Sequence, residues 1–481
     1  MWQSLLNLWN AFWAIPHILL FLTLAWLLYL VPLCLWIMLQ KREPVATLSW
    51  VLSLALLPYV GYLVYFLLGP QKINRQRLRR RLARNRLDPK VLAGPLDASC
   101  AELALLGQAT TGLAPSHAQS VHLLVDGGAT YDAILDAVAG ARDHVHLEYY
   151  IYMPDRIGTL LRDALVERVR AGVKVKLLLD ALGSSKVRAR FLRPLVEAGG
   201  EIAWFHPARL RAFSRPWVNL RSHRKIVVVD GRVAFTGGIN VTDEEDERLR
   251  PDAYRDLHLR LTGEIVRSLQ LVFIEDWVYA SGQSREAFAG RTLWPREEGG
   301  DISAQVLVSG PDSSWEAIHR MHVAAIHEAR HRVWLATPYF VPGEAARMAL
   351  TSAALGGLDV RLLVPKNSDS KLVTYAARSY FDELLAAGVK VHEYGPRMLH
   401  SKALLCDDNL ALIGSANFDN RSFRLNFEVS VLLRDRDMAS QLEQLMEGEF
   451  AGAPAVERDR HRSLWRHRLP EAVARLMSPL L

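Results

Sequence analysis

The chain has 481 residues, half of them apolar, and a formal net charge of +7 at pH 7. Its three cysteines, Cys34, Cys100 and Cys406, are odd in number and lack metal-ligand spacing. This excludes a disulfide-stapled mini-domain and indicates unpaired thiols in a reducing compartment. The length suffices for two or more domains with their own hydrophobic cores.

The first 40 residues contain no Asp, Glu, Lys or Arg, and residues 17–39 are almost entirely apolar. About 20 such residues span a bilayer. A second uncharged run follows at residues 45–68. We therefore expect residues 1–70 to form an N-terminal transmembrane helical hairpin of two membrane helices. The alternatives are a cleavable signal peptide for the first run, and bending at Pro58 and Gly61 into a re-entrant or interfacial helix for the second.

The positive charge is concentrated in residues 72–86, where eight Lys or Arg residues occur without an acidic one. A basic belt beside a membrane segment is retained in the cytoplasm and attracted to anionic lipid. We expect residues 71–115 to form a basic juxtamembrane helix or linker, with an unstructured linker as the alternative. Lys41 and Arg42, in the turn that would face outward, fit this orientation poorly. The charge is therefore no argument for nucleic-acid binding.

From residue 116 onward, β-rich runs alternate with helical stretches. Strands are expected at 121–124, 145–151, 173–179 and 201–205, and helices at 157–171 and 190–198. The same order returns with strands at 333–337, 360–364 and 389–394, and helices at 344–355 and 370–387. The pattern predicts an α/β fold made of two repeats, residues 116–295 and 296–481.

An octapeptide of the pattern H-x-K-x-x-x-x-D occurs once in each repeat. The copies are His223-Arg224-Lys225-Ile226-Val227-Val228-Val229-Asp230 and His400-Ser401-Lys402-Ala403-Leu404-Leu405-Cys406-Asp407. Each is followed at the same distance by a small-residue turn that ends in an asparagine, Asn240 or Asn417. One copy could be chance, whereas two copies in register indicate a duplicated half-site.

We expect each octapeptide to lie on a β-strand, so that His223 and Lys225, two residues apart, leave the same face of the sheet. Asp230-Gly231 is a strong hairpin-turn signal, and Asp407 has the corresponding place in the second repeat. Both aspartates are expected to brace the site by hydrogen bonds rather than act as bases. Plain turn formation is the alternative.

The repeated histidines and lysines are suited to chemistry at phosphorus. A neutral imidazole can attack phosphorus, and a second, protonated imidazole can donate a proton to the leaving oxygen. Two ammonium groups can hold the non-bridging oxygens, with donors near Asn240 and Asn417 adding to the cradle. The two repeats must therefore meet around one phosphate. No metal or other cofactor is required, because no carboxylate or His/Cys set has ligand spacing.

Two acidic residues, Asp256 and Glu428, precede alternating strands after the asparagine turns. A histidine that reacts through one ring nitrogen needs an acceptor at the other. We therefore expect Asp256 and Glu428 to fix the imidazole tautomers. The acidic run at residues 243–246 is interpreted as a solvated loop.

With these motifs the sequence resembles the phospholipase D superfamily and, within it, the bacterial cardiolipin synthases. Further strings that carry the resemblance are Arg221-Ser222-His223-Arg224-Lys225, Gly310-Pro311-Asp312, Thr337-Pro338-Tyr339-Phe340-Val341-Pro342 and Arg421-Ser422-Phe423-Arg424-Leu425-Asn426-Phe427-Glu428. The resemblance extends from the N-terminal hydrophobic segments to about residue 450. It implies two phospholipase D-type repeats, each a mixed β-sheet flanked by helices, related by pseudo-two-fold symmetry.

The resemblance also implies an activity, the transfer of a phosphatidyl group from one phosphatidylglycerol to another to give cardiolipin and glycerol. His223 would form the phosphohistidine, and His400 would protonate the leaving glycerol and then deprotonate the second phosphatidylglycerol. The implied partners are phosphatidylglycerol and other anionic lipids, without nucleic acid. The implied location is a bacterial inner membrane, with the catalytic domain facing the cytoplasm. The alternatives are a membrane phospholipase D with water as acceptor, a nuclease, and a non-catalytic membrane scaffold.

Two further segments are candidates for lipid contact. Residues 207–220 are an insertion relative to the second repeat and hold several arginines with Phe213 and Trp217. An ordinary exposed loop is the alternative. The Arg-rich tail at residues 457–468, with Trp465, is the second candidate, and a solvated helix face is its alternative.

Overall fold

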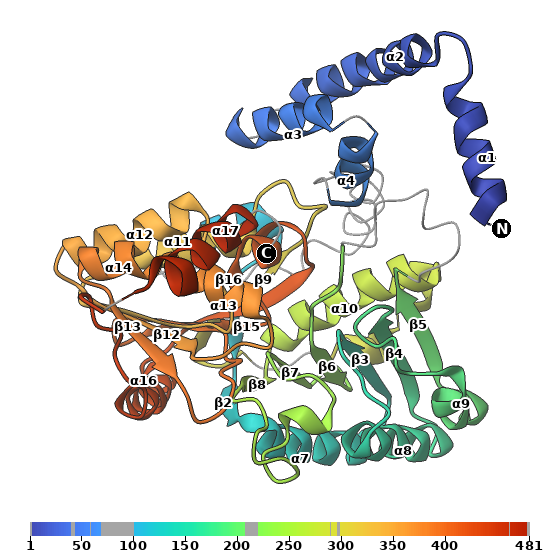
Figure 1. The fold of residues 1–481 in the computed structure, drawn as a ribbon. Coiled ribbons are helices and arrows are strands. Elements are labelled where there is room, and N and C mark those ends of the chain that lie inside the picture. Colours follow the sequence, from blue (N-terminus) through green and yellow to red (C-terminus); the bar gives the residue numbers. More distant parts are fainter. Residues whose placement is uncertain are drawn as a thin grey trace. The chain divides into compact units, whose positions relative to one another are not determined.

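The structure is a computed structural model that describes residues 2–39, 44–57, 59–68, 101–206, 220–288, 290–295, 299–460 and 462–478. The basic run 72–86, Lys41, Arg42, Cys100, and the insertion with Phe213 and Trp217 lie outside these residues. The chain divides into an N-terminal unit, within residues 1–71, and one compact unit that holds the rest of the described residues. Figure 1 shows the course of the chain through both.

The N-terminal unit consists of four helices, α1 (Trp2–Trp13), α2 (Ile18–Leu39), α3 (Pro44–Leu56) and α4 (Val60–Leu68). Within the described residues, α2 alone is long and apolar enough to cross a membrane. The second hydrophobic segment is instead divided into α3 and α4, of 13 and 9 residues. Tyr59 lies between them with a φ of 62°. The structure therefore resembles the bent alternative for this segment, and a second complete span stays a prediction.

Helices α2, α3 and α4 pack together through aromatic rings and one close backbone approach. The Tyr65 ring contacts those of Trp36 and Trp50 edge to face. A Cβ atom at Gly61 would lie 2.5 Å from the carbonyl oxygen of Ser53. Only glycine lets α4 come this close to α3, which explains why the bend falls beside Gly61.

In the compact unit, the first repeat forms a seven-stranded mixed sheet with the order β2-β8-β7-β6-β3-β4-β5. Its strands are β2 (Ser120–Val125), β3 (His144–Tyr149), β4 (Lys174–Asp180), β5 (Glu201–Phe205), β6 (Ile226–Val229), β7 (Val233–Gly237) and β8 (Leu257–Thr262). β3, β4 and β5 run parallel, and the other neighbours are antiparallel.

The second repeat forms an eight-stranded sheet with the order β1-β9-β17-β15-β14-β10-β12-β13. Its strands are β1 (Ser116–Ala118), β9 (Ile302–Ser309), β10 (Arg332–Ala336), β12 (Asp359–Pro365), β13 (Lys390–Tyr394), β14 (Ala403–Cys406), β15 (Leu410–Gly414) and β17 (Glu428–Arg434). β11 (Phe340–Val341) and β16 (Phe418–Asp419) form a small parallel ribbon. Apart from β1, this order and its strand directions correspond one by one to the first sheet. The predicted duplicated α/β fold is confirmed.

The segment before the first repeat belongs structurally to the second sheet. β1 pairs with β9 in an antiparallel register, and Leu103 of α6 (Ala101–Thr111) lies in the second repeat's core. The buried Gln305 side chain of β9 donates hydrogen bonds of 3.1 and 3.0 Å to the carbonyl oxygens of Ala104 and Leu113. Residues 101–118 thus pack along the edge of the second sheet, although they precede the first repeat in the chain.

The two sheets enclose a shared hydrophobic core, and helices cover their outer faces (Figure 1). Val228 and Leu259 of the first sheet and Ile413 and Val429 of the second belong to this shared core, together with apolar residues of α10 and α16. The helices of the compact unit after α6 are α7 (Asp126–Ala139), α8 (Arg156–Arg170), α9 (Ala189–Ala198), α10 (Ile265–Ser281), α11 (Ala317–Glu328), α12 (Glu344–Leu355), α13 (Lys371–Arg378), α14 (Phe381–Ala387), α15 (Asn420–Arg424), α16 (Arg436–Ala451) and α17 (Leu469–Leu476).

The octapeptides lie on strands only in part. β6 and β14 begin immediately after the lysines, so that the His-x-Lys segments precede the strands rather than belong to them. The expectation that each octapeptide lies on a strand along its whole length is corrected accordingly. The residue before each histidine, Ser222 or Leu399, instead forms an isolated parallel bridge with the opposite repeat.

Candidate active site

The two repeats exchange backbone hydrogen bonds at their His-x-Lys segments. His223 N donates to the carbonyl oxygen of Phe427 at 2.9 Å, and Phe427 N donates to that of Arg221 at 2.9 Å. In the same way, His400 N donates to the carbonyl oxygen of Arg255 at 2.8 Å. Each His-x-Lys segment therefore lies beside the residue that precedes the acidic residue of the other repeat.

The acidic residues contact the histidines in this crossed arrangement. His223 Nδ1 lies 3.0 Å from Glu428 Oε2 of the second repeat, and His400 Nδ1 lies 2.5 Å from Asp256 Oδ2 of the first. Both carboxylates are fully buried. A hydrogen bond from Nδ1–H to a carboxylate leaves Nε2 with its lone pair free to react. The geometry thus supports the tautomer-fixing role expected for Asp256 and Glu428.

The two lysines lie inside the same buried cluster. Lys225 Nζ donates to the His223 carbonyl oxygen at 2.9 Å, and Lys402 Nζ donates to that of His400 and lies 3.2 Å from Asp256 Oδ2. Burial lowers the pKa of the Lys225 ammonium to about 7, a net result to which the nearby Glu428 carboxylate is opposed and the Lys402 charge contributes. Burial likewise lowers the pKa of Lys402. Two ammonium groups crowded in this way stabilise an anion between them.

The pKa of each imidazole is lowered from its ordinary value. Burial lowers the pKa of His223, opposed by the Glu428 carboxylate. Burial and the adjacent Lys402 ammonium lower the pKa of His400 to about 4. Lys402 acts on His223 and Lys225 acts on His400, so each histidine is influenced electrostatically by the lysine of the other repeat. The four residues expected around one phosphate are therefore brought together.

The two asparagines border this cluster in different ways. The Asn240 side chain donates to Glu245 Oε1 at 2.9 Å, and its oxygen lies 3.3 Å from Ile151 N. The backbone N–H of Asn417 donates to Ser422 Oγ at 3.2 Å, while its buried side-chain oxygen lacks a partner among the described residues. Of these two asparagines, Asn417 is therefore the one whose buried side-chain oxygen has no hydrogen-bond donor among the described residues.

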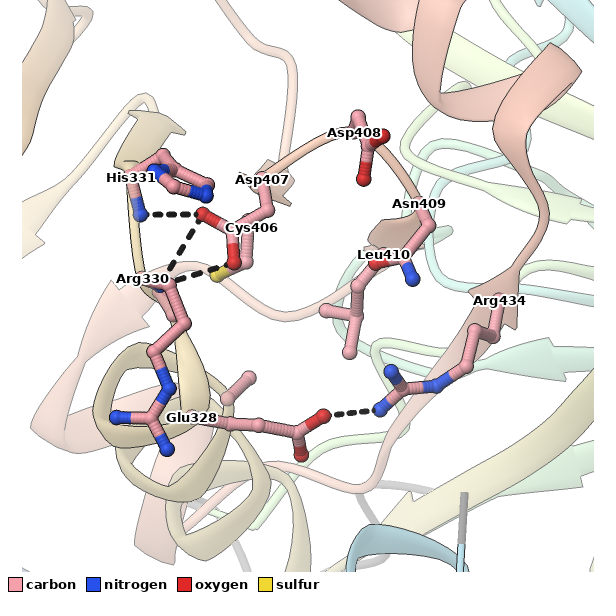
Figure 2. A pocket seen from close by; sticks show the side chains of 11 residues that line it. Glu328, Arg330, His331, Cys406, Asp407, Asp408, Asn409, Leu410 and Arg434 are labelled. Atoms are coloured by element: carbon pink, nitrogen blue, oxygen red, sulfur yellow. Dashed lines mark hydrogen bonds and ion pairs between the residues drawn. The ribbon is translucent and has the colours of Figure 1, made fainter. Parts of the chain in front are cut away.

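The motif aspartates lie at the far ends of β6 and β14. The Asp407 carboxylate accepts hydrogen bonds from the backbone N–H groups of Arg330, His331 and Arg332 at 2.8–3.1 Å, in a surface pocket that also contains the Glu328–Arg434 ion pair (Figure 2). Five residues of extended chain from lysine to aspartate correspond to roughly 15 Å. This geometry supports bracing and no direct contact with the reacting phosphate.

Asp230 makes the same contacts in the first repeat. Its carboxylate accepts from the backbone N–H groups of Arg142, Asp143 and His144 at 2.8–2.9 Å. The φ angles of Asp230 and Asp407 are 53° and 54°, in the left-handed region that aspartate tolerates better than most residues. One side chain thus forms the turn and ties it to the start of the neighbouring strand.

Glu245 is a site residue that the sequence analysis missed. The acidic run at residues 243–246 was expected to be solvated, but Glu245 and Asp246 are each only 1% exposed. The Glu245, Asp256 and His400 ligand atoms lie within 4.8 Å of one another. Glu245 stands five residues after Asn240, and Ser422 stands five residues after Asn417. This equal spacing in the two repeats is the signal in the sequence that could have identified Glu245.

Glu245, Asp256 and His400 are residue types that bind metals, but the surroundings disfavour a cation. Lys402 Nζ lies 3.2 Å from Asp256 Oδ2 and 2.8 Å from His400 Nδ1, so an ammonium group already occupies the space between them. A metal ion there would face a like charge at close range. The expectation that the reaction needs no metal remains a prediction on this ground.

Burial and the neighbouring Asp256 carboxylate raise the pKa of Glu245 from 4.5 to about 8. A carboxyl group whose pKa is raised by folding contributes stability below its unfolded pKa, near 4.5, and loses it as the pH rises through about 8. The glutamine in Glu245→Gln does not ionise, so its contribution to stability does not depend on pH. The wild-type stability, relative to Glu245→Gln, should therefore fall by roughly 1 kcal/mol per pH unit between these values.

Thermal denaturation of both proteins in the same detergent from pH 5 to 9 measures this difference. The glutamine oxygen retains the acceptor for Asn240, so the variant should fold. Parallel pH profiles for the two proteins would show that Glu245 ionises normally.

The asparagine turns of the two half-sites differ at two positions, and one of them lies beside the acidic residue. Gly238 in the first repeat corresponds to Ser415 in the second. A Cβ atom at Gly238 would lie 2.2 Å from Asp256 Oδ1. Ser415 Oγ instead donates to Glu428 Oε2. The shorter aspartate therefore needs glycine beside it, while the longer glutamate is held by a serine.

These features define the class of the protein. Two mixed sheets in matching order, each contributing a His-Lys pair that meets a carboxylate of the other, are the fold and site of a phospholipase D-type enzyme that acts on phosphodiesters.

Comparisons with known proteins give the family. A family model described as cardiolipin synthase, PLD-like domain, matches residues 134–249 and 323–449, and one described as phospholipase D-nuclease N-terminal matches residues 18–70. The chain belongs to the cardiolipin synthase family of the phospholipase D superfamily. It is 37% identical to cardiolipin synthase 1 of Bacillus anthracis, over 96% of this chain and 94% of that protein. It is 40% identical to a cardiolipin synthase of Geobacillus thermodenitrificans, over 92% of this chain and 91% of that protein.

A solved structure supports the fold independently of sequence. The phosphatidylserine synthase of Haemophilus influenzae Rd KW20 superposes with a TM-score of 0.62 at 14% identity, covering 79% of this chain and all of that one. At this identity the likeness concerns the fold alone.

Proposed function

We propose that the protein is a membrane phosphatidyltransferase that converts two phosphatidylglycerols into cardiolipin and glycerol. The observation that carries this proposal is the crossed pairing of His223 with Glu428 and of His400 with Asp256 around two buried lysines. Two such half-sites together supply the nucleophile, the acid and the two ammonium groups that reaction at one phosphodiester needs. The relatives named cardiolipin synthase, which cover nearly the whole chain, support the choice of lipid.

In the first step, His223 Nε2 attacks the phosphorus of one phosphatidylglycerol. The bond from phosphorus to the glycerol headgroup breaks, and protonated His400 gives its proton to the departing oxygen. The phosphodiester's negative charge beside His400 favours the protonated imidazole before the reaction. Lys225 and Lys402 hold the non-bridging oxygens as charge develops on them. The products are glycerol and a phosphatidyl group on His223.

In the second step, His400 Nε2 takes the proton from a headgroup hydroxyl of another phosphatidylglycerol. That oxygen attacks phosphorus, the bond to His223 breaks, and cardiolipin leaves. His400 is again protonated and His223 is again free, so the cycle consumes no cofactor. Asp256 and Glu428 keep both reacting nitrogens aimed at the phosphate throughout.

The lipid products of the purified protein test the proposal. Incubation with phosphatidylglycerol alone, followed by lipid mass spectrometry and a glycerol assay, should yield cardiolipin and glycerol in equal amounts. Phosphatidic acid as the main product would identify a phospholipase D that uses water. A protein that forms neither lipid, while intact by thermal denaturation, would contradict a phosphatidyl-transfer function altogether.

We also propose that α2 anchors the chain in the bacterial inner membrane and that the compact unit faces the cytoplasm. The uncharged length of α2 and the basic run at residues 72–86 support this orientation. Protease digestion of the compact unit in inverted but not in right-side-out vesicles is the expected result. The domain limits 1–70, 71–115, 116–295 and 296–481 stay proposals of the same kind.

A further inference from the structure

The C-terminal helix turns its large apolar side chains away from the body of the compact unit. α17 continues a π-helical turn, Leu464–Arg468, and packs against α13. Trp465, Leu469, Val473 and Leu476 follow an i, i+4, i+8, i+11 spacing, which places them on one side of the helix. They are 75%, 43%, 54% and 80% exposed.

The opposite side of this helix is small and polar, yet it is the side that attaches to the fold. Ala474 lies in the second repeat's core, and Glu471 pairs with Arg462. The Tyr380 hydroxyl donates a 2.9 Å hydrogen bond to Ser478 Oγ. Because a surface helix normally buries its apolar side, this reversed orientation shows that the exposed side does not serve the packing of the described fold.

The charges beside the exposed apolar side match an anionic surface. The turn Leu464–Arg468 contains Arg466, His467 and Arg468, all exposed, and no acidic residue. Arginines that flank a tryptophan and aliphatic side chains are typical of helices that lie in the headgroup region of anionic bilayers. A water-exposed helix has no need of four large apolar residues on its outer side.

The helix is also attached to the segment that follows the second motif. Asn420 Nδ2 donates a 3.2 Å hydrogen bond to the carbonyl oxygen of Ser478. Asn420 begins α15, whose Ser422 hydroxyl accepts a hydrogen bond from Asn417 N. The C-terminal helix and the active-site residue Asn417 are thus two hydrogen bonds apart through one short helix.

We propose that the segment Leu464–Leu476 lies in the interface of an anionic bilayer and holds the active-site segment around Asn417 at the lipid surface. Trp465, Leu469, Val473 and Leu476 would enter the acyl boundary, with Arg466 and Arg468 among the headgroups. This segment lies outside both matched family segments. The inference rests on the proposed function only in that the substrate is a membrane lipid.

The test places an environment-sensitive fluorescent amino acid at position 476 of the full-length protein, reconstituted in phosphatidylglycerol-containing vesicles. Leu160 of α8, 47% exposed, is the matched control position in the first repeat. Nitroxide-bearing lipid should quench the probe at 476 and leave the probe at 160 unchanged. Equal responses at the two positions would overturn the proposal. Fluorescence changes at 476 that follow the protein-to-lipid ratio without lipid quenching would overturn it in favour of a second copy of the chain.

Activity gives an independent measurement. The exposed pair Trp465→Ser and Val473→Ser should reduce turnover in vesicles roughly threefold or more, with lipid quenching at 476 lost. Turnover of dispersed phosphatidylglycerol in detergent micelles should not change, which separates this proposal from the chemistry itself. Equal losses in vesicles and micelles would show that the two side chains support the fold rather than the bilayer contact.

Discussion

Replacing His223 with alanine should abolish formation of the phosphoenzyme, whereas replacing His400 should abolish turnover but leave the first chemical step measurable. With phosphatidylglycerol as substrate, both variants should lose at least about 10³-fold in turnover. The distinction arises with an activated substrate, phosphatidyl-p-nitrophenol, because p-nitrophenolate leaves without a proton. His400→Ala should release one equivalent of p-nitrophenol in a burst and His223→Ala none.

Mass spectrometry of the His400→Ala protein, quenched with denaturant at mildly alkaline pH because a phosphorus–nitrogen bond is labile in acid, should then show a phosphatidyl group on His223. His331→Ala is a suitable control, because this exposed histidine touches Asp407 only through its backbone N–H. A burst in His223→Ala and none in His400→Ala would exchange the roles of the two histidines. Bursts in both variants would contradict a shared nucleophile and acid altogether.

Replacing Asp256 with asparagine should have the second-largest effect and exceed that of Glu428→Gln. Asp256 holds both His400 and Lys402, while Glu428 holds His223 and Ser415. An amide in place of the carboxylate permits the wrong imidazole tautomer and leaves the buried Lys402 charge unpaired. We expect losses in kcat of about 10³-fold for Asp256→Asn and about 10²-fold for Glu428→Gln.

Glu201→Gln, in a partly exposed ion pair with Lys176, is the control for a carboxylate-to-amide change and should retain full activity. Gly238→Ser should also be inactive, although serine stands at the equivalent position 415, because its Cβ would collide with the Asp256 carboxylate. Wild-type kcat in Asp256→Asn would mean that neither His400 nor Lys402 depends on this carboxylate for its function.

Much of the fold followed from local patterns in the sequence. The alternation of β-rich and helical runs predicts which stretches are strands and which are helices. The repeated octapeptide shows which parts of the two halves correspond. The histidines and lysines could be grouped because phosphodiester chemistry needs both pairs at once. The structure agrees with this grouping through the coupling of Lys402 to His223 and of Lys225 to His400.

The crossed contacts could not be read from the sequence. Asp256 belongs to the same repeat as the first motif, yet it contacts His400, 144 residues away. Periodicity within a strand carries no information on which repeat supplies its partner. Glu245 was missed for a related reason, since a run of acidic residues resembles a solvated loop until its tertiary surroundings are known.

The division of the second hydrophobic segment was open for a different reason. The composition of a segment indicates whether it is apolar enough for a lipid environment, and residues 45–68 are uncharged throughout. The bend at Tyr59 depends on the close approach of Gly61 to Ser53 and on rings supplied by α2. Such packing becomes visible only when neighbouring helices are placed.

The pairing of β1 with β9 has a consequence for biogenesis. The ribosome makes residues 116–118 almost 190 residues before their partner strand, so this edge must wait, unpaired, while the whole first sheet is synthesised. Glu428, whose carboxylate contacts His223, is synthesised later still, because it follows His223 by 205 residues. A nascent chain that carries only the first repeat therefore lacks both the carboxylate that contacts His223 and the histidine that contacts Asp256, so neither half-site is assembled before the second repeat has been made.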